Sequence, residues 1–193
     1  FNQRGVDEIL QMILTIGRIV GGEDRARKLV ETMQSELDAI AESAKKFPFR
    51  PRVYFEEWFD PLISGICWVE ELIEIAGGVP VFPELKKFQG AKDRIIDSQK
   101  VIAANPQVII GSWCGKAVKK DLIRSREGWE NVEAVRKNHV YEVKSAYILQ
   151  PGPASLTEGI RQIHKILAKV TGVEIEESLN PLEKTDADLL KSF

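Results

Sequence analysis

The segment from Val53 to Gly65, VYFEEWFDPLISG, constrains the fold most, because an apolar run typical of a buried strand passes directly into an aromatic and acidic segment. Residues 66–76 then show the apolar spacing of a helix, which Gly77 and Gly78 end. An apolar run at 108–111 and a further expected strand at 139–143 repeat the order of strand, loop and helix. This alternation predicts a three-layer α/β domain with about four mostly parallel strands and right-handed crossovers.

Two helices are expected before this alternation. Residues 6–20 carry one apolar stripe, and residues 23–46 carry a second stripe that ends before Pro48. A helix of about 24 residues, rising 1.5 Å per residue, extends about 36 Å and is long enough to brace a domain. We therefore predict two helices over residues 1–50, of which the longer is a scaffold helix, an α/β domain over 51–171 and a tail over 172–193.

The candidate site follows from the expected sheet, because ligands of open α/β sheets bind at the carboxyl ends of the strands. Three loops are expected there, over residues 58–64, 112–116 and 144–152. Several aromatic rings on neighbouring strand ends favour a large, flat, partly apolar ligand held by stacking. The alternative, in which these rings only pack the loops, stays open. The predicted ligand-binding residues are Trp58, Phe59, Asp60, Trp113, Tyr147 and Gln150.

The sequence lacks the common catalytic and nucleotide-binding motifs GxxxxGK[ST], GxGxxG, GxSxG and HExxH. Glu56 and Glu57 are adjacent on a strand, so their side chains point to opposite faces and do not form an acid/base pair. Cys67 and Cys114 lie outside any C-x-x-C spacing. No catalytic residue, metal site or cofactor is therefore predicted. One enzymatic alternative stays open, in which Lys116 lowers the pKa of the Cys114 thiol and activates it.

The charge balance bears on the partner. A formal net charge of −2 gives the chain no general attraction to nucleic acid or acidic lipid. We therefore expect a small-molecule ligand and no nucleic-acid partner.

A set of short motifs occurs in a fixed order along about residues 1–171. Together these motifs resemble the metal-chelate-type periplasmic binding proteins of ABC importers, and most closely those that bind cobalamin. The motifs are Gly17-Arg18 with Gly21-Gly22, Asp60–Gly65, Trp68, Glu71–Gly78, Asn105-Pro106 before Val108–Ile110, Gly128-Trp129, Ala134–Arg136 and Gln150–Pro153.

Such receptors have two α/β lobes joined by one long helix, and they clamp the ligand between the lobes. The resemblance implies that residues 25–46 are the bridging helix, that the carboxyl-terminal lobe begins at Val53, and that the amino-terminal lobe is missing from this chain. It also implies a non-catalytic protein, an extracytoplasmic location (periplasmic or membrane-anchored outside the cell) and the membrane subunits of an ABC permease as partner. Because a lobe without its partner exposes an apolar rim, we also expect a homodimer, through the rim or through exchange of the 6–20 helix.

Two departures from the family pattern shape the expected cargo and docking. The family's docking glutamate, on the helix before the N-P-x-V-I strand, is Gln99 here, so permease docking is assigned to Asp97 and Gln99. The family's Arg-Pro-Gly-Pro-Arg is Gln150-Pro-Gly-Pro-Ala154, which lacks the cations that hold haem propionates or an anionic siderophore. We therefore expect a corrinoid cargo. A ferric siderophore or haem remains an alternative, as does an interaction module whose exposed lobe face mediates self-association.

Overall fold

The computed structural model describes residues 2–175, and the predicted tail from residue 176 onward lies outside the described residues. The centre of the fold is a sheet of five strands in the order β2-β1-β4-β5, with β3 also paired to β1. Every pairing is parallel except that of β2 with β1. The predicted three-layer, mostly parallel α/β fold is confirmed, with one more strand than expected. The strands are β1 (Arg52–Phe59), β2 (Leu62–Ser64), β3 (Val79–Pro80), β4 (Val108–Gly111) and β5 (Val140–Glu142).

The central strands β1 and β4 are apolar because both of their faces are covered. Phe55 and its partner Ile110 are almost completely buried in the core on one face of the sheet. Tyr54 and its partner Ile109 are completely buried in a second core on the other face. Successive side chains of a strand point to opposite faces, so one short apolar run supplies both cores.

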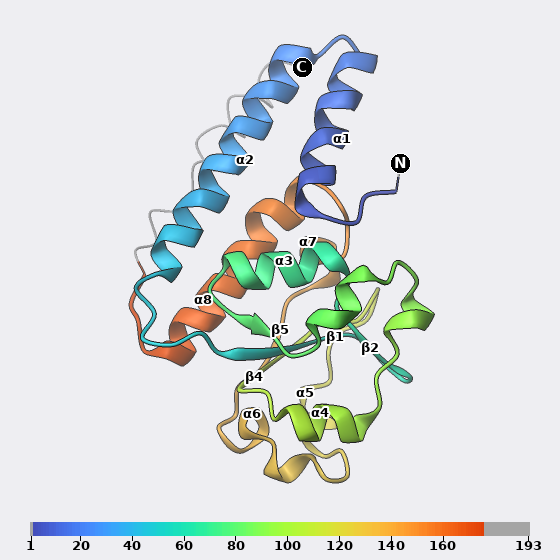
Figure 1. Ribbon diagram of the computed structural model, residues 1–193, viewed down its shortest axis with the longest axis vertical. Helices are drawn as coiled ribbons and strands as arrows, with labels where there is room; N and C mark the ends of the chain where they lie inside the picture. Colours follow the sequence, from blue (N-terminus) through green and yellow to red (C-terminus); the bar gives the residue numbers. More distant parts are fainter. Residues whose placement is uncertain (1, 176–193) are drawn as a thin grey trace.

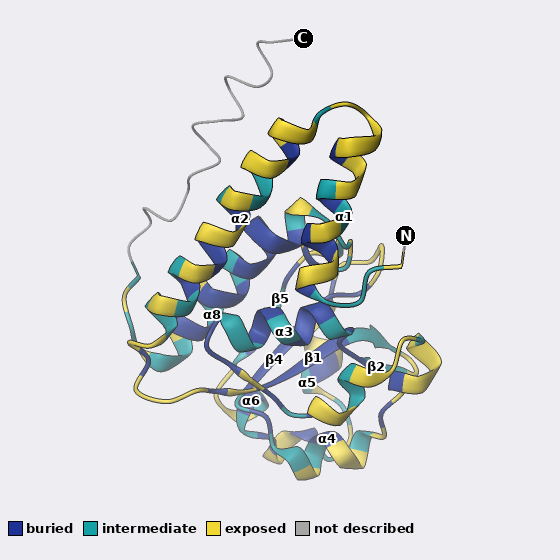
Figure 2. Ribbon diagram, turned by 45° about the horizontal axis from the view of Figure 1, so that its top comes forward, coloured by how far each residue is buried: buried dark blue, intermediate teal, exposed yellow. Residues whose placement is uncertain are grey.

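The first core lies under a layer of long helices, in which α3 and α8 cover the sheet (Figure 1). A hairpin of α1 and α2 extends beyond this layer, and its tip is exposed (Figure 2). The helices on this side of the sheet are α3 (Cys67–Ile75) and α8 (Ile160–Thr171) in the layer, with the π-helical turn η4 (Ser155–Gly159) before α8, and α1 (Val6–Ile19) and α2 (Glu23–Ala44) in the hairpin.

The amino-terminal part of α1 is covered within the monomer, where Val6, Ile9, Leu10 and Ile13 join the core. The exposed apolar residues of the hairpin tip are Ile16, Ile19 and Val20. Most of the α1 stripe is therefore already packed against its own lobe. Homodimerisation stays a prediction, for which light scattering over a concentration series is the direct measurement.

The second core lies under a layer of short helices on the opposite face of the sheet. Trp129 is completely buried there and meets Tyr54 edge to face, with 6.1 Å between the ring centroids. No helix in the described part of the chain is both long enough and apolar enough to cross a bilayer. The remaining elements are η1 (Pro83–Lys87), η2 (Ala91–Arg94), α4 (Ser98–Ala104), α5 (Lys120–Arg124), η3 (Trp129–Asn131), α6 (Glu133–Arg136) and α7 (Ser145–Ile148).

The prediction of a loop over residues 58–64 is wrong. Strand β1 continues to Phe59, turns at Asp60 and Pro61, and returns as the antiparallel strand β2, with Phe59 opposite Leu62. Aromatic and β-branched side chains favour extended chain, and a two-residue connection is enough to join antiparallel strands. Since β4 ends at Gly111, opposite Glu56, the hairpin extends β1 beyond the carboxyl end of its neighbour.

Candidate functional site

Three aromatic side chains contact one another in series at the carboxyl edge of the sheet, with their ring planes tilted by 39° and 38°. The ring centroids of Trp58 and Phe59 are 5.1 Å apart, and those of Phe59 and Trp113 are 4.6 Å apart. Trp113 follows β4, and the parallel pairing of β1 with β4 brings the two strand ends together. Trp58 and Phe59 are half-buried, whereas Trp113 is only 2% exposed. In this aromatic stack (Trp58, Phe59 and Trp113), the first two rings present surface and Trp113 supports them from the interior.

A buried ion pair fixes the base of the aromatic stack. The indole Nε1 of Trp113 donates a hydrogen bond to Glu56 Oε1 at 3.0 Å. Arg126 donates to both carboxylate oxygens of Glu56, at 2.5 and 2.9 Å. Glu56 is fully buried, and a buried carboxylate requires such partners. The guanidinium of Arg126 also lies 4.6 Å from the ring centroid of Trp129, which links the aromatic stack to the second core.

Glu57, the next residue of β1, points to the other face and holds the hairpin. Both of its carboxylate oxygens accept hydrogen bonds from Arg94, at 2.7 and 3.2 Å. Arg94 is almost completely buried and also donates to the carbonyl of Ser64 in β2. The prediction that Glu56 and Glu57 point to opposite faces is confirmed. The two carboxylates act as separate structural anchors and not as an acid/base pair.

Lys116 lies over the exposed rings of the aromatic stack. Its ammonium nitrogen is 4.9 Å from the ring centroid of Trp58 and 5.3 Å from that of Phe59. The loop that carries it turns at Gly115, whose φ of +69° suits glycine. The Gly115 amide donates a hydrogen bond to Ser145 Oγ at 3.3 Å, which joins this loop to α7. Sequence reasoning assigned Lys116 no ligand role, because its position over the rings depends on the hairpin that was missed.

The other predicted ligand residues border the same edge without joining the aromatic stack. Asp60 is exposed in the hairpin turn, and its carbonyl accepts a hydrogen bond from Trp58 Nε1 at 2.9 Å. Tyr147 on α7 is 38% exposed, and Gln150 after α7 is also exposed. The strand order β1-β4-β5 places Tyr147 and Gln150 beyond the 112–116 loop from the hairpin. Along the carboxyl edge, the aromatic rings therefore lie at the β1 end, and the polar ends of Tyr147 and Gln150 lie towards β5.

The residues assigned to permease docking lie at the start of α4. Asp97 is the N-cap of α4, and its Oδ1 accepts a hydrogen bond from the Gln99 amide at 2.7 Å. Both side chains are exposed. Gln99 also borders a surface hollow that is lined in addition by Leu62, Arg126 and Glu127.

Neither histidine of the chain is placed to activate Cys114, which is exposed in the loop after β4. His139 precedes β5 at the amino edge of the sheet, and its Nδ1 lies 3.2 Å from the Gln107 carbonyl oxygen. His164 on α8 is buried between the Ala76 carbonyl and the Ser43 hydroxyl, and this burial lowers its pKa. Within residues 2–175, no group of three or more His, Cys, Asp or Glu side chains is arranged to hold a metal ion.

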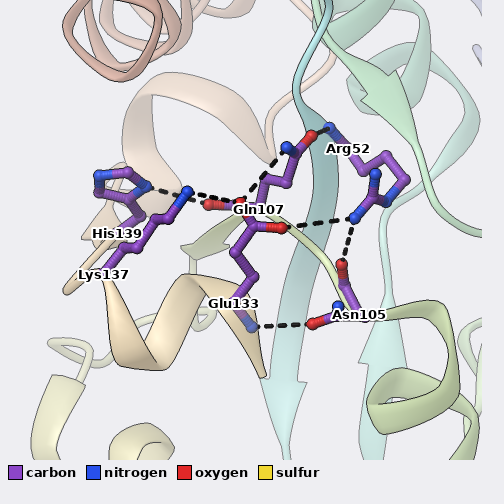
Figure 3. Close-up of polar contacts among 6 residues, drawn as sticks. All are labelled: Arg52, Asn105, Gln107, Glu133, Lys137 and His139. Atoms are coloured by element: carbon purple, nitrogen blue, oxygen red, sulfur yellow. Dashed lines mark hydrogen bonds and ion pairs between the residues drawn. The ribbon is translucent and has the colours of Figure 1, made fainter. Parts of the chain in front are cut away.

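A polar network crosses the amino edge of the sheet, opposite the aromatic stack (Figure 3). Gln107 accepts from the Arg52 amide at 3.1 Å and donates to Glu133 at 3.4 Å. Glu133 also accepts from Lys137 at 2.8 Å, and this hydrogen bond is the largest cause of its lowered pKa. Because these polar groups bind one another, the network joins the starts of β1, β4 and β5 and acts as a structural clamp.

Comparison with known proteins identifies the chain's relatives. The family model described as "Periplasmic binding protein" matches residues 1–147. The uncharacterized ABC transporter substrate-binding lipoprotein YvrC of Bacillus subtilis is 26% identical over 161 residues, which are 81% of this chain and 48% of that protein. The chain thus spans about half the length of the curated relative that it matches.

Two solved structures share the fold at low sequence identity. The periplasmic haem-binding protein RhuT of Roseiflexus superposes with a TM-score of 0.74 at 18% identity, over 88% of this chain and 65% of that one. The periplasmic vitamin B12 binding protein BtuF of Vibrio cholerae superposes with a TM-score of 0.68 at 18% identity, over 88% of this chain and 64% of that one. At this identity the likeness shows the fold alone.

Proposed function

The chain belongs to the periplasmic binding protein family, and from this premise we propose that it is part of the substrate-binding component of an ABC transporter for metal chelates. The family is one of binding proteins and not of enzymes, which argues against thiol catalysis by Cys114. The chain is extracytoplasmic, either periplasmic or anchored outside the cell, as the family and the lipoprotein relative are. Its proposed partner is the membrane permease of that transporter.

The observation that carries the proposal is the aromatic stack at the carboxyl edge of the sheet. Two half-buried rings, Trp58 and Phe59, lie where open α/β sheets bind ligands. Trp113 contacts Phe59 and is itself fixed by a hydrogen bond to the buried ion pair of Glu56 and Arg126, which favours one arrangement of the rings. Preorganised aromatic surface suits a flat macrocycle, because little side-chain entropy is lost when the ligand stacks.

We propose a corrinoid as the cargo. The exposed amide of Gln150 and the carboxylate of Asp60 are suited to hydrogen bonds with the amides at the rim of a corrin. Haem is the specific alternative, since one structural neighbour is named for haem and another for vitamin B12. A ferric siderophore is the other alternative within the class.

Permease docking is proposed at the amino end of α4. Asp97 is the acidic residue there, and Gln99 beside it is uncharged. The variant Asp97→Asn removes the charge but keeps an N-cap acceptor. Loss of permease binding by this variant, with unchanged thermal stability, is the expected result if the charge makes the contact.

Calorimetry tests the proposed binding site. We expect the 193-residue chain to bind cyanocobalamin only weakly, because burial of a large ligand needs walls on both sides. Trp58→Ala should weaken this binding about tenfold, because a stacked aromatic pair contributes roughly 0.5–1.5 kcal/mol beyond its buried area. The matched control is Phe49→Ala, which removes an exposed ring that precedes β1 at the opposite edge of the sheet. Equal losses in the two variants would contradict the site. Binding of haemin or a ferric siderophore in place of cyanocobalamin would change the cargo and leave the site in place.

A further inference from the structure

We propose that the cargo carries an anionic group and that Lys116 is the residue of this chain that selects for it. This inference rests on the proposed chelate-binding function and deepens it, because it narrows the class of cargo. It also assigns a ligand role to a residue in the loop after β4 that the sequence motifs did not indicate.

The first argument is that the Lys116 ammonium has no ion-pair partner within the described residues. The carboxylates that lie nearest in the fold already have partners, since Glu56 binds Arg126 and Glu57 binds Arg94. Glu142 at the end of β5 accepts a hydrogen bond from the Val118 amide at 3.0 Å.

By contrast, Lys116 and Lys144 are exposed, and neither forms an ion pair with any described residue. The hydrogen bond from the Gly115 amide to Ser145 Oγ joins the two loops that carry them. Asp60 in the hairpin turn is the exposed acid of this edge and likewise lacks an ion pair within residues 2–175. The groups of the described edge without an ion pair are therefore two cations, Lys116 and Lys144, and two carboxylates, Asp60 and Glu142, and the Lys116 ammonium is not directly neutralised by any of them.

The second argument is the position of the ammonium. Lys116 lies within 5.3 Å of two ring centroids, and the negative face of an aromatic ring attracts a cation there. The cation therefore lies over the rings themselves, on the surface that a flat ligand would approach. A carboxylate or phosphate on the periphery of that ligand then meets an ammonium that is already in place.

The requirement for an anionic group restricts the class of chelate that can be the cargo. A corrinoid with a phosphodiester, a porphyrin with carboxylates and an anionic siderophore all satisfy the requirement, whereas a chelate without any anionic group does not. The absence of arginines from Gln150–Ala154 therefore does not require a neutral cargo, because another loop supplies a cation.

The test uses chelates that differ in whether they carry a peripheral anionic group, titrated calorimetrically into the 193-residue protein. Cyanocobalamin and dicyanocobinamide share a corrin, but only the first has the phosphodiester. Haemin, a tris-catecholate ferric siderophore and neutral ferrichrome extend the comparison. The variants are Lys116→Gln, Lys116→Arg and, as the matched control, Lys120→Gln, which removes an exposed charge from α5.

We expect Lys116→Gln to weaken binding of the anionic chelate about tenfold and to leave its uncharged counterpart unchanged, because a charge-assisted hydrogen bond is lost. Lys116→Arg should restore most of the affinity, and Lys120→Gln should have no effect. Equal weakening of anionic and neutral chelates by Lys116→Gln, or preference of the unaltered protein for the neutral chelate, would overturn the inference but keep the proposed function. Failure of every chelate to bind the unaltered protein would overturn both.

Discussion

Replacing Glu70 by Gln is expected to stabilise the protein at neutral and alkaline pH. Glu70 lies on α3, is 2% exposed and faces Gly65, where an added Cβ would meet its carboxylate oxygen at 2.3 Å. Burial is the largest cause that raises the pKa of Glu70, from 4.5 to about 8, and the opposing effect of Lys86 is smaller. The folded state therefore prefers the protonated carboxyl group.

The sign and size of the effect follow from linkage. With a raised folded-state pKa, the contribution of Glu70 to stability is fully present below pH 4.5 and is lost as the pH rises to about 8. At 1.36 kcal/mol per pKa unit, the whole loss is about 5 kcal/mol, of which about 3 kcal/mol has occurred by pH 7. Glutamine is uncharged at every pH, so it does not incur this loss.

Urea denaturation followed by tryptophan fluorescence at pH 5, 7 and 8.5 measures the difference. We expect the free energy of unfolding of Glu70→Gln to exceed that of the unaltered protein by about 3 kcal/mol at pH 7 and by more at pH 8.5, with little difference at pH 5. The control Glu42→Gln changes an exposed carboxylate on α2 and should leave the pH dependence unaltered. Parallel pH profiles for the unaltered protein and Glu70→Gln would refute the reasoning.

Three further predictions concern polar contacts that stabilise the fold. Arg126→Gln should lower the free energy of unfolding by about 3–5 kcal/mol, because it leaves Glu56 buried without a charged partner, and urea denaturation that shows no loss would contradict the ion pair. Asp97→Ala should lower the free energy of unfolding by about 1 kcal/mol and Asp97→Asn by less, since Asn can still cap α4. Equal melting temperatures of the two variants and the unaltered protein would show that the cap does not stabilise the fold. Glu133→Gln should lower the free energy of unfolding at pH 7, because the lowered pKa of Glu133 shows that its charged form stabilises the folded state. The difference in stability between variant and unaltered protein should vanish as the pH falls through the folded-state pKa, which lies below 4.5. A difference that persists in acid would exclude a charge effect.

The sequence predicts those parts of the fold whose signals are local. The runs around Val53 and Val108 are apolar on both faces, and such runs identify central parallel strands without further information. The stripe of α8, with Ile160, Ile163 and Leu167 buried, is similarly evident from its spacing. Strand β2 was missed because three residues after Pro61 carry too little periodicity to separate a strand from a loop.

The candidate site depends on contacts that no local pattern encodes. The partners Glu56 and Arg126 are 70 residues apart, so the only signal was a carboxylate on an otherwise apolar strand, which requires a partner when it is buried. The aromatic character of the edge was predictable from Trp58, Phe59 and Trp113, but their order of burial was not. Trp113 is the interior support because β4 ends sooner than β1, and this difference in length arises from the hairpin.

The most direct test of chelate binding at the aromatic stack uses the four tryptophans as separate reporters. Each indole N–H donates a hydrogen bond to a different acceptor, so the four resonances report on different places. Trp58 donates to the Asp60 carbonyl and Trp68 to the Ile148 carbonyl, whereas Trp113 donates to the Glu56 carboxylate and Trp129 to the Ser98 hydroxyl. In ¹⁵N-labelled protein titrated with cyanocobalamin or haemin, we predict that the Trp58 indole resonance moves most and that of the fully buried Trp129 least. Saturable binding of either chelate with the Trp58 resonance unmoved would contradict the assignment of this edge as the ligand-binding site.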